Sequence, residues 1–253
     1  MKIDSQLLVK FRNHIHPLLI ELSKLKVKYK IEIINEYIPV VGMPIIFSVN
    51  HQDFRDAPIT QIATKCRSYI YAGKQKLYWL DWLFFVLNGV IWVDRKDKRS
   101  KTESKGVLIE YLKKGQTILW FPEGTWNLTD NLLVMEMKWG IIDVAYQANA
   151  QIIPVALYYD RTEEICRVKF GEPILGDLLK DKAMSVCILR DTMASLYYDV
   201  MSEQTVLHRE NITISKLREE VYKAVEEYPP FDLVYESSCI YHSTVLRNDL
   251  FSG

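Results

Sequence analysis

Short apolar runs and longer stretches of helical periodicity alternate along most of the chain. The apolar runs are rich in β-branched and aromatic residues, and they occupy residues 44–49, 68–72, 90–93, 117–121, 152–158 and 167–170. Apolar residues recur at helical spacing over residues 57–63, 101–114, 140–148 and 178–202. Strands that alternate with helices predict the α/β class, in which a mixed, largely parallel sheet is flanked by helices.

The N-terminal stretch, residues 6–30, has the pattern of one amphipathic helix. The apolar side chains that recur on one face are Leu7, Leu8, Phe11, Ile15, Leu18, Leu19, Leu22 and Leu25. Lysine and arginine side chains occupy much of the remaining surface. A basic amphipathic helix can lie in a membrane interface or pack on its own domain, and the sequence leaves both interpretations open.

Residues 78–89 predict a second helix of unusual composition, strongly apolar and aromatic, with Asp81 as its single charged residue. Apolar runs of this length are buried or interfacial in most proteins, because they are too short to span a bilayer. Burial in the core and contact with lipid or an acyl chain both explain the pattern.

These patterns divide the chain into three parts. Residues 1–30 hold the amphipathic helix, residues 31–203 hold the alternating strands and helices, and residues 204–253 form a C-terminal part of unknown role. Within the last part, residues 215–227 predict a charged helix that ends before Pro229 and Pro230. Residues 231–253 show no recognisable chemistry.

Composition and charge exclude some classes of partner and site. Lys and Arg together number 32, as do Asp and Glu, so net charge gives no reason to expect nucleic-acid binding. The four cysteines lie at positions 66, 166, 187 and 239. This spacing suits neither a zinc site nor a disulfide framework, and it fits a reducing compartment. We expect a cytoplasmic protein, because the sequence shows no secretory signal and no membrane-spanning stretch.

The stretch Asn50–Asp56 carries the strongest chemical signal. His51 follows a short apolar run that predicts a buried strand, and Asp56 comes five residues later at the start of a predicted helix. This spacing can bring the Asp56 carboxylate to one imidazole nitrogen of His51 and leave the other free to accept a proton. A helix N-terminus also favours the charged form of Asp56.

Three further segments lie at or near predicted strand ends. They are Gly89–Arg95, Phe121–Thr125 and Ile152–Ala156. Ligands of open α/β sheets bind at the carboxyl ends of the strands. We therefore expect residues that are far apart in the sequence to meet in one crevice.

The four blocks, in this order and spacing, resemble those of the glycerophospholipid acyltransferase family, whose best-known member is lysophosphatidic acid acyltransferase. The family's blocks are N-H-x-x-x-x-D, a G-x-I-F-V-x-R-like motif, F-P-E-G-T and a hydrophobic stretch containing proline. The likeness covers about residues 44–170, and Lys138 and Gly140 resemble the basic-plus-glycine element that follows the third block. Four blocks in the correct order are far more specific than any one of them.

The resemblance implies an enzyme of phospholipid biosynthesis that moves a fatty acyl group from a thioester, acyl-CoA or acyl carrier protein, to a hydroxyl of a lysophospholipid such as lysophosphatidic acid. It implies His51 as the general base and Asp56 as the group that orients and polarises it. The acyl thioester is a co-substrate, and neither a metal nor a bound cofactor is implied.

The resemblance also implies that Arg95 binds the phosphate of the acceptor. A guanidinium suits this role, because it binds phosphate oxygens in a bidentate fork. The alternative for Arg95 is a surface ion pair with Asp94 or Asp97. Lys74 is a weaker candidate for contact with the phosphate.

The F-P-E-G-T block supplies three further substrate-binding candidates, Glu123, Gly124 and Thr125. Glu123 cannot bind phosphate directly, so we expect it to hold Arg95 or to accept a hydrogen bond from a glycerol hydroxyl. Backbone N–H groups of this glycine-containing turn are candidates for an oxyanion hole.

Two departures from the family pattern bear on substrate and location. Trp126 follows the F-P-E-G-T threonine where many family members have arginine, which makes an acceptor other than lysophosphatidic acid more plausible. Many members also carry N-terminal spanning helices, for which residues 6–30 and the tryptophan-rich helix are the expected substitute, attaching the protein to the cytoplasmic face of a membrane. A phospholipid transacylase and a non-catalytic lipid-binding protein remain as alternatives.

Overall fold

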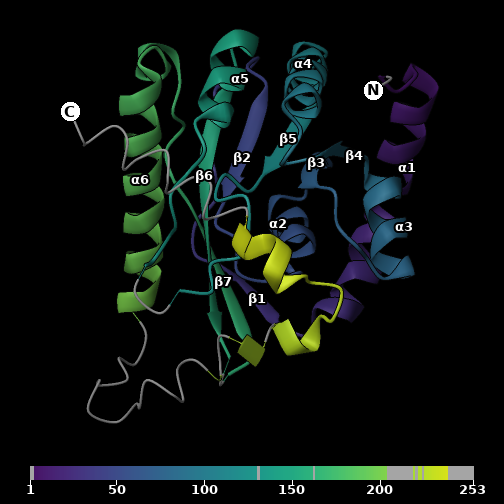
Figure 1. The fold of residues 1–253 in the computed structure, drawn as a ribbon, viewed down its shortest axis with the longest axis vertical. Coiled ribbons are helices and arrows are strands. Elements are labelled where there is room, and N and C mark those ends of the chain that lie inside the picture. The colour runs from purple at the N-terminus through teal and green to yellow at the C-terminus, as the bar shows by residue number, and fades with distance from the viewer. Residues whose placement is uncertain are drawn as a thin grey trace.

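The computed structural model describes residues 3–129, 132–161, 163–203, 219, 222–223 and 225–238. Within them, seven strands form one sheet in the order β1-β7-β6-β2-β5-β3-β4 (Figure 1). The strands are β1 (Lys30–Ile33), β2 (Ile45–Val49), β3 (Ser68–Gly73), β4 (Val90–Val93), β5 (Thr117–Trp120), β6 (Gln151–Asp160) and β7 (Ile165–Phe170). The helices are α1 (Gln6–Val27), α2 (Asp56–Thr64), α3 (Trp79–Asn88), α4 (Lys98–Lys113), α5 (Gly140–Ala148) and α6 (Lys182–Ser202), with the short 3₁₀ helix η1 (Gly176–Leu179).

The sheet is mixed and largely parallel, as the alternation of strands and helices predicts. Neighbouring strands run parallel except β6 and β7, which are antiparallel. Strand β1 was not predicted, because four residues at a sheet edge are too short for a clear period. The predicted helix over residues 6–30 is three residues too long at its C-terminal end. Helix α1 ends at Val27, where Lys28 takes a left-handed conformation, with φ at 63°.

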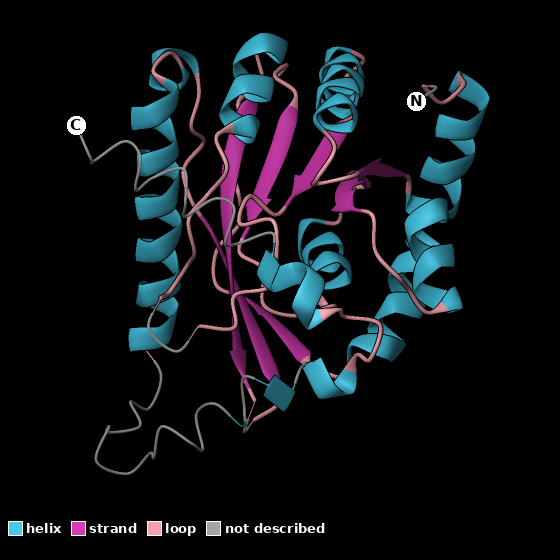
Figure 2. Ribbon diagram, viewed as in Figure 1, coloured by secondary structure: helices cyan, strands magenta, loops and turns pink. Residues whose placement is uncertain are grey.

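Helices cover both faces of the sheet, so the central strands are buried on both sides (Figure 2). Alternate side chains of β2 illustrate the two cores. Ile46 packs with residues of α4, α5 and α6, whereas Phe47 on the opposite face packs with residues of α1 and α2. This packing fixes the position of the residues that follow β2.

Helices α1 and α3 pack against each other at one side of the molecule (Figure 1). Together they expose a broad apolar surface. Its members are Leu7, Phe11, Leu18, Leu22 and Leu25 of α1 with Trp79, Leu80, Trp82 and Leu83 of α3. We call these residues the α1–α3 apolar surface. No helix in the described part of the chain is long and apolar enough to cross a membrane.

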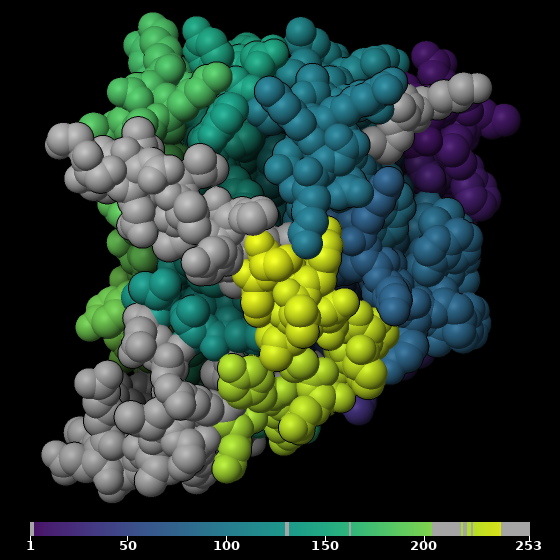
Figure 3. Space-filling model, in the orientation of Figure 1, coloured from purple at the N-terminus to yellow at the C-terminus, as the bar shows by residue number. Residues whose placement is uncertain are grey.

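A C-terminal segment, residues 225–238, lies across the face of the molecule where the parallel strands end (Figures 1 and 3). We call these residues the C-terminal strap. Residues 225–227 and 233–238 are helical within it. Of the rest of the predicted helix over residues 215–227, only residues 219 and 222–223 are described. The tail after residue 238 lies outside the described residues.

Candidate active site

Three of the four predicted blocks converge at the carboxyl ends of β2, β4 and β5. A cavity of about 1750 Å³ opens there, and His51, Arg95, Gly124 and Thr125 line it. The fourth block, Ile152–Ala156, is buried within β6 and does not line this cavity. The part of the wall formed by α1 and α3 is mostly apolar, with Leu22, Leu25, Leu80, Leu83, Phe84 and Leu87. The part near β4 and α4 is basic, with Lys96, Lys98, Lys101, Lys105 and Lys138. The cavity therefore combines an apolar part and a basic part, which suits a ligand with a fatty chain and an anionic group.

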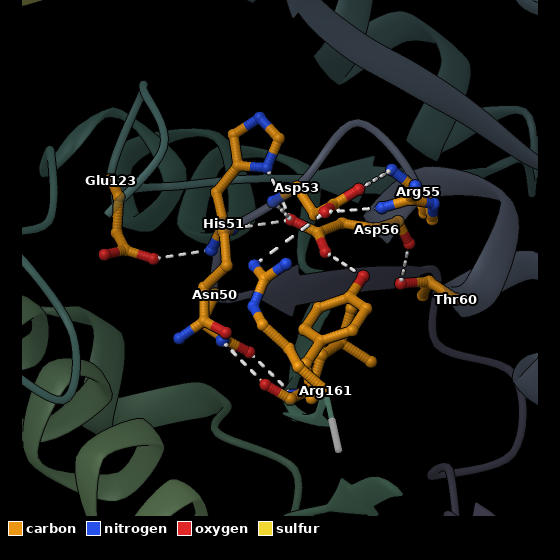
Figure 4. Close-up of polar contacts among 11 residues, drawn as sticks. Asn50, His51, Asp53, Arg55, Asp56, Thr60, Glu123 and Arg161 are labelled. Atoms are coloured by element: carbon orange, nitrogen blue, oxygen red, sulfur yellow. Dashed lines mark hydrogen bonds and ion pairs between the residues drawn. The ribbon is translucent and has the colours of Figure 1, made fainter. Parts of the chain in front are cut away.

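His51 and Asp56 make the contact that their spacing predicts. Strand β2 ends at Val49, and Asp56 is the first residue of α2, so the intervening loop turns the carboxylate back toward the imidazole. The distance from His51 Nδ1 to Asp56 Oδ2 is 2.8 Å (Figure 4). A carboxylate on Nδ1 holds the proton there, so Nε2 is the nitrogen that can accept another.

Asp56 is fully buried and is held by several donors besides His51. The backbone N–H groups of Gln52 and Asp53 donate to Oδ2 at 2.7 and 2.9 Å. The Tyr159 hydroxyl, at the end of β6, donates to Oδ1. These hydrogen bonds hold the carboxylate in one orientation behind the imidazole.

Aromatic side chains fix the plane of the His51 ring. Phe121 stacks on it with ring centroids 4.2 Å apart, and Trp126 meets it edge-on at 6.0 Å. One fifth of the His51 side chain is exposed, and it lines the cavity. No hydrogen bond from another described residue reaches Nε2. The ring is therefore held rigidly with its free nitrogen available to a ligand.

Glu123 is placed differently from the sequence-based expectation. Its Oε1 accepts the backbone N–H of His51 and its Oε2 accepts that of Met135, both at 2.7 Å. The side chain is buried, and it is not among the residues that line the cavity. Glu123 therefore contacts neither Arg95 nor the space for an acceptor. It joins the F-P-E-G-T loop to the backbone of His51 and is a positioning residue.

Burial raises the pKa of Glu123 to about 8, against the opposing effect of the two backbone N–H donors. Its folded-state pKa thus lies above its ordinary value of 4.5, so the folded protein binds this proton more tightly than the unfolded chain. The stability that this provides is complete below about pH 4.5 and is lost as the pH rises through 8.

We therefore expect Glu123→Gln to reduce the pH dependence of stability. Between pH 5 and pH 8, the free energy of unfolding of the wild type should fall relative to that of the variant by more than about 1 kcal/mol. Urea unfolding at both pH values measures this difference, and other titrating groups cancel because the two proteins share them. Parallel pH dependences of the two proteins would show that Glu123 stays ionised throughout.

Asp53 and Arg55 form a second buried pair in the loop before α2. Arg55 donates from its backbone N–H and from Nη1 to the Asp53 carboxylate, both at 2.9 Å. Burial raises the pKa of Asp53 to about 6, and the charge of Arg55 opposes the rise. The pair stabilises the loop that presents Asp56.

Gly124 and Thr125 line the cavity, as predicted. Gly124 has a left-handed φ of 79°, which favours glycine, whereas a Cβ there would meet only the flexible end of the Lys138 side chain. The Gly124 N–H donates to the Phe121 carbonyl at 3.1 Å, which removes it as an oxyanion-hole donor. The Thr125 hydroxyl is buried and has no hydrogen-bond partner among the described residues. A bound ligand could use it.

Arg95 reaches the cavity across β3, where Gly73 leaves room for it. A Cβ on Gly73 would lie 2.6 Å from Arg95 Nε. The guanidinium donates to the Gly124 carbonyl and forms a bidentate ion pair with Glu236 of the C-terminal strap. Nearly buried, Arg95 is not the surface residue of the alternative interpretation.

Lys74 lies outside the cavity, contrary to the prediction. It is exposed and lines a separate, smaller hollow with Trp79, Trp82 and Trp92. Successive residues at a strand end face opposite sides of the sheet. Because Gly73 faces Arg95, the next residue is directed elsewhere.

The sequence pattern missed three residues that shape the site, Tyr159, Phe231 and Glu236. Tyr159 is the second-last residue of β6, a strand that was predicted only as far as residue 158. Phe231 and Glu236 lie in the part of the chain judged to have no recognisable chemistry. The proline pair before Phe231 was the only local signal that the chain changes direction there.

A family model described as Acyltransferase matches residues 30–158. Three similar proteins are each named 1-acyl-sn-glycerol-3-phosphate acyltransferase. The Chlamydomonas reinhardtii protein is 29% identical over 51% of this chain and 39% of its own length. The Saccharomyces cerevisiae protein is 29% identical over 51% of this chain and 42% of its own length. The Borreliella burgdorferi protein is 32% identical, with 49% of both chains covered. The match thus spans half or less of each relative.

A similar fold occurs in the crystal structure of the 1-acyl-sn-glycerophosphate acyltransferase PlsC from Thermotoga maritima. The TM-score is 0.60 at 18% sequence identity, and the match covers 77% of this chain and 83% of the other. At that identity the likeness establishes the arrangement of the sheet and helices.

Proposed function

We propose a function from the premise that this chain belongs to the Acyltransferase family, as glycerophospholipid acyltransferase motifs predict. The proposed reaction transfers a fatty acyl group from a thioester, acyl-CoA or acyl carrier protein, to a hydroxyl of a lysophospholipid. The names of the relatives support lysophosphatidic acid as one acceptor of this class.

One observation carries the proposal. The His51–Asp56 pair stands at the wall of a large cavity, with Nε2 of His51 available and the carboxylate buried behind the ring. A hydroxyl is a weak nucleophile at neutral pH, and a positioned imidazole makes it reactive by accepting its proton as it attacks.

The reaction then needs no acyl-enzyme intermediate. Nε2 of His51 takes the hydroxyl proton while the acceptor oxygen attacks the thioester carbonyl carbon. The tetrahedral intermediate collapses by breaking the carbon–sulfur bond, and the thiolate receives the proton from Nε2. The products are an ester and a free thiol. Asp56 stabilises the imidazolium between these two proton transfers.

The two parts of the cavity suit the two parts of the substrates. The leucine-rich wall of α1 and α3 accommodates acyl chains, and the lysines near α4 attract phosphate groups. Thr125 also lines the cavity, and its buried hydroxyl offers a hydrogen bond to a substrate. This arrangement favours a substrate with a fatty chain and an anionic head over a uniformly polar one.

Thiol release by the purified protein tests the function. Long-chain acyl-CoA and the acyl carrier protein thioester are each offered with a lysophospholipid acceptor, and the acylated lipid is measured alongside the thiol. Acceptor-dependent release in equal amounts of both products is the expected result. Acyl movement between phospholipids in the absence of any thioester would instead establish a transacylase.

We also propose that the α1–α3 apolar surface attaches the protein to a membrane. Trp79 is 71% exposed and Leu25 is 82% exposed, although both are large and apolar. Lys24 and Lys26 flank Leu25 on α1, but they pair with Glu21 and Asp81, so the apolar side chains carry the proposed attachment. Because Leu22, Leu25 and Leu80 also line the cavity, the surface leads directly from the membrane to the site.

Trp79→Glu is expected to weaken binding to vesicles of phosphatidylcholine and phosphatidylglycerol by about 10-fold or more, because burying a large apolar side chain is worth roughly 1.5–3 kcal/mol. Vesicle co-sedimentation measures the effect. Tyr198→Glu is the matched control, since Tyr198 is 55% exposed on α6 at the other side of the molecule (Figure 1). An equal loss in both variants would exclude this surface as the attachment site.

A further inference from the structure

The C-terminal strap forms part of the cavity wall and contacts both Trp126 and Arg95. Phe231 stacks on Trp126 with ring centroids 4.0 Å apart and planes inclined by 15°. Tyr228 stacks on Phe54 at 4.6 Å and lines the cavity together with Phe231. Trp126, where many family members have arginine, thus serves as the platform for an apolar contact from the strap.

Charged contacts hold the strap at both ends of this aromatic cluster. Glu227 pairs with Arg55 in the loop before α2. At the other end, the Tyr235 ring lies 5.0 Å from the centre of the Arg95 guanidinium. The strap is therefore attached to both the His51 loop and the Arg95 region.

Glu236 takes the position that an anionic ligand of Arg95 would occupy. Its two carboxylate oxygens accept from Nη1 and Nη2 of Arg95, with the Nη1 contact at 2.7 Å. The side chains of Glu236 and Arg95 are only 6% and 11% exposed. A buried bidentate pair of this kind satisfies the same fork that would bind two phosphate oxygens.

A phosphate monoester and a phosphate diester are affected differently by this pair. The monoester carries a charge of about −1.5 to −2 at pH 7 and has three terminal oxygens, so it gains most from an unoccupied guanidinium. The diester carries one charge and two terminal oxygens, so it loses less when Arg95 is neutralised. A carboxylate on Arg95 therefore disfavours the monoester selectively.

We propose that Glu236 is a specificity-determining residue, which occupies the phosphate-binding fork of Arg95 and shifts acceptor preference from lysophosphatidic acid toward lysophospholipids whose phosphate is a diester. The proposal rests on the proposed acyl transfer to a lysophospholipid. Trp126 and Glu236 both reduce the positive charge available to the acceptor phosphate. Trp126 stands where many family members have arginine, and Glu236 neutralises Arg95.

The test compares Glu236→Gln with the wild-type chain of 253 residues on two acceptors of equal acyl-chain length, lysophosphatidic acid and lysophosphatidylglycerol. The amide removes the negative charge and one of the two acceptors from the fork. The ratio of kcat/KM for the monoester to that for the diester is expected to rise by about 10-fold or more, the discrimination of one charge-assisted hydrogen bond. Glu226→Gln makes the same change at an exposed strap position and should leave the ratio unaltered.

The other outcomes overturn the proposal. An equal rise for both acceptors would make the strap a general lid, and an equal fall would make Glu236 a residue that only supports the fold. Glu236→Asp is the second variant, for use if Glu236→Gln is unstable. It keeps the charge but shortens the side chain by one carbon, so the ratio of kcat/KM for the monoester to that for the diester should rise less than in Glu236→Gln.

A binding measurement separates this proposal from the proposed reaction. Calorimetric titration with glycerol 3-phosphate needs no turnover, and tighter binding to Glu236→Gln than to the wild type, by the same factor, is expected. If no thiol is released with either acceptor, the proposed reaction is refuted, but this comparison of binding is unaffected. Equal binding of glycerol 3-phosphate to both proteins would refute the role of Glu236.

Discussion

Replacing His51 with alanine is expected to lower kcat for thiol release by about 10²- to 10⁴-fold, the usual contribution of a positioned general base. This corresponds to roughly 3–5 kcal/mol of barrier. Folding should be preserved, because Asp56 keeps two backbone N–H donors and the Tyr159 hydroxyl when the imidazole is removed. Thiol release under saturating substrate and thermal unfolding measure the two effects separately.

His14→Ala is the control for this variant, since His14 is exposed on α1, away from the His51–Asp56 pair. It should retain the wild-type rate. Wild-type activity in His51→Ala would remove His51 from the reaction. A wild-type protein that binds lysolipid vesicles but releases no thiol would instead favour the non-catalytic lipid-binding alternative.

Asp56→Asn is expected to reduce kcat by about 10²-fold or more, because the imidazolium loses the buried charge that stabilises it. The structure also predicts how the amide will lie. Three N–H donors point at Oδ2, so the amide oxygen should occupy that position and the amide nitrogen should face the Tyr159 hydroxyl. A loss of about 1–3 kcal/mol of stability accompanies the poorer hydrogen bonding.

The double variant His51→Ala, Asp56→Asn distinguishes catalysis through His51 from an independent role of Asp56. If Asp56 acts only by orienting and stabilising the imidazole, the double variant should be no slower than His51→Ala. Multiplication of the two single effects would show that Asp56 acts on the substrate or the fold by another route. Asp191→Asn, at an exposed position of α6, controls for loss of one carboxylate.

The fold was largely predictable because its central strands are buried on both faces. Residues such as Ile46 and Phe47 lie in opposite cores, so the whole run is apolar and stands out from its helical neighbours. Edge strand β1 has only intermediate or exposed residues, which gives no such contrast. The same exposure made the end of α1 hard to place, since Lys28 and Lys30 are compatible with either state.

The candidate site also has residues that the sequence placed correctly and residues that it did not. Gly124 and Thr125 line the cavity as expected, since the loop that carries them continues directly from a buried strand. Glu123 lies in the same loop, but it faces inward and holds the His51 backbone. A local pattern places a loop near a site, but the direction of each side chain depends on the backbone donors that surround it.

The sequence by itself determined the partnership of His51 and Asp56, because five residues of separation, a strand end and a helix start suffice to bring the groups together. Only the tertiary structure decided the partner of Arg95. Glu236 is 141 residues away in sequence, and the charged pair exists because the strap folds back over the cavity. Short-range geometry follows from local periodicity, whereas a contact across such a distance depends on the packing of every element between the two residues.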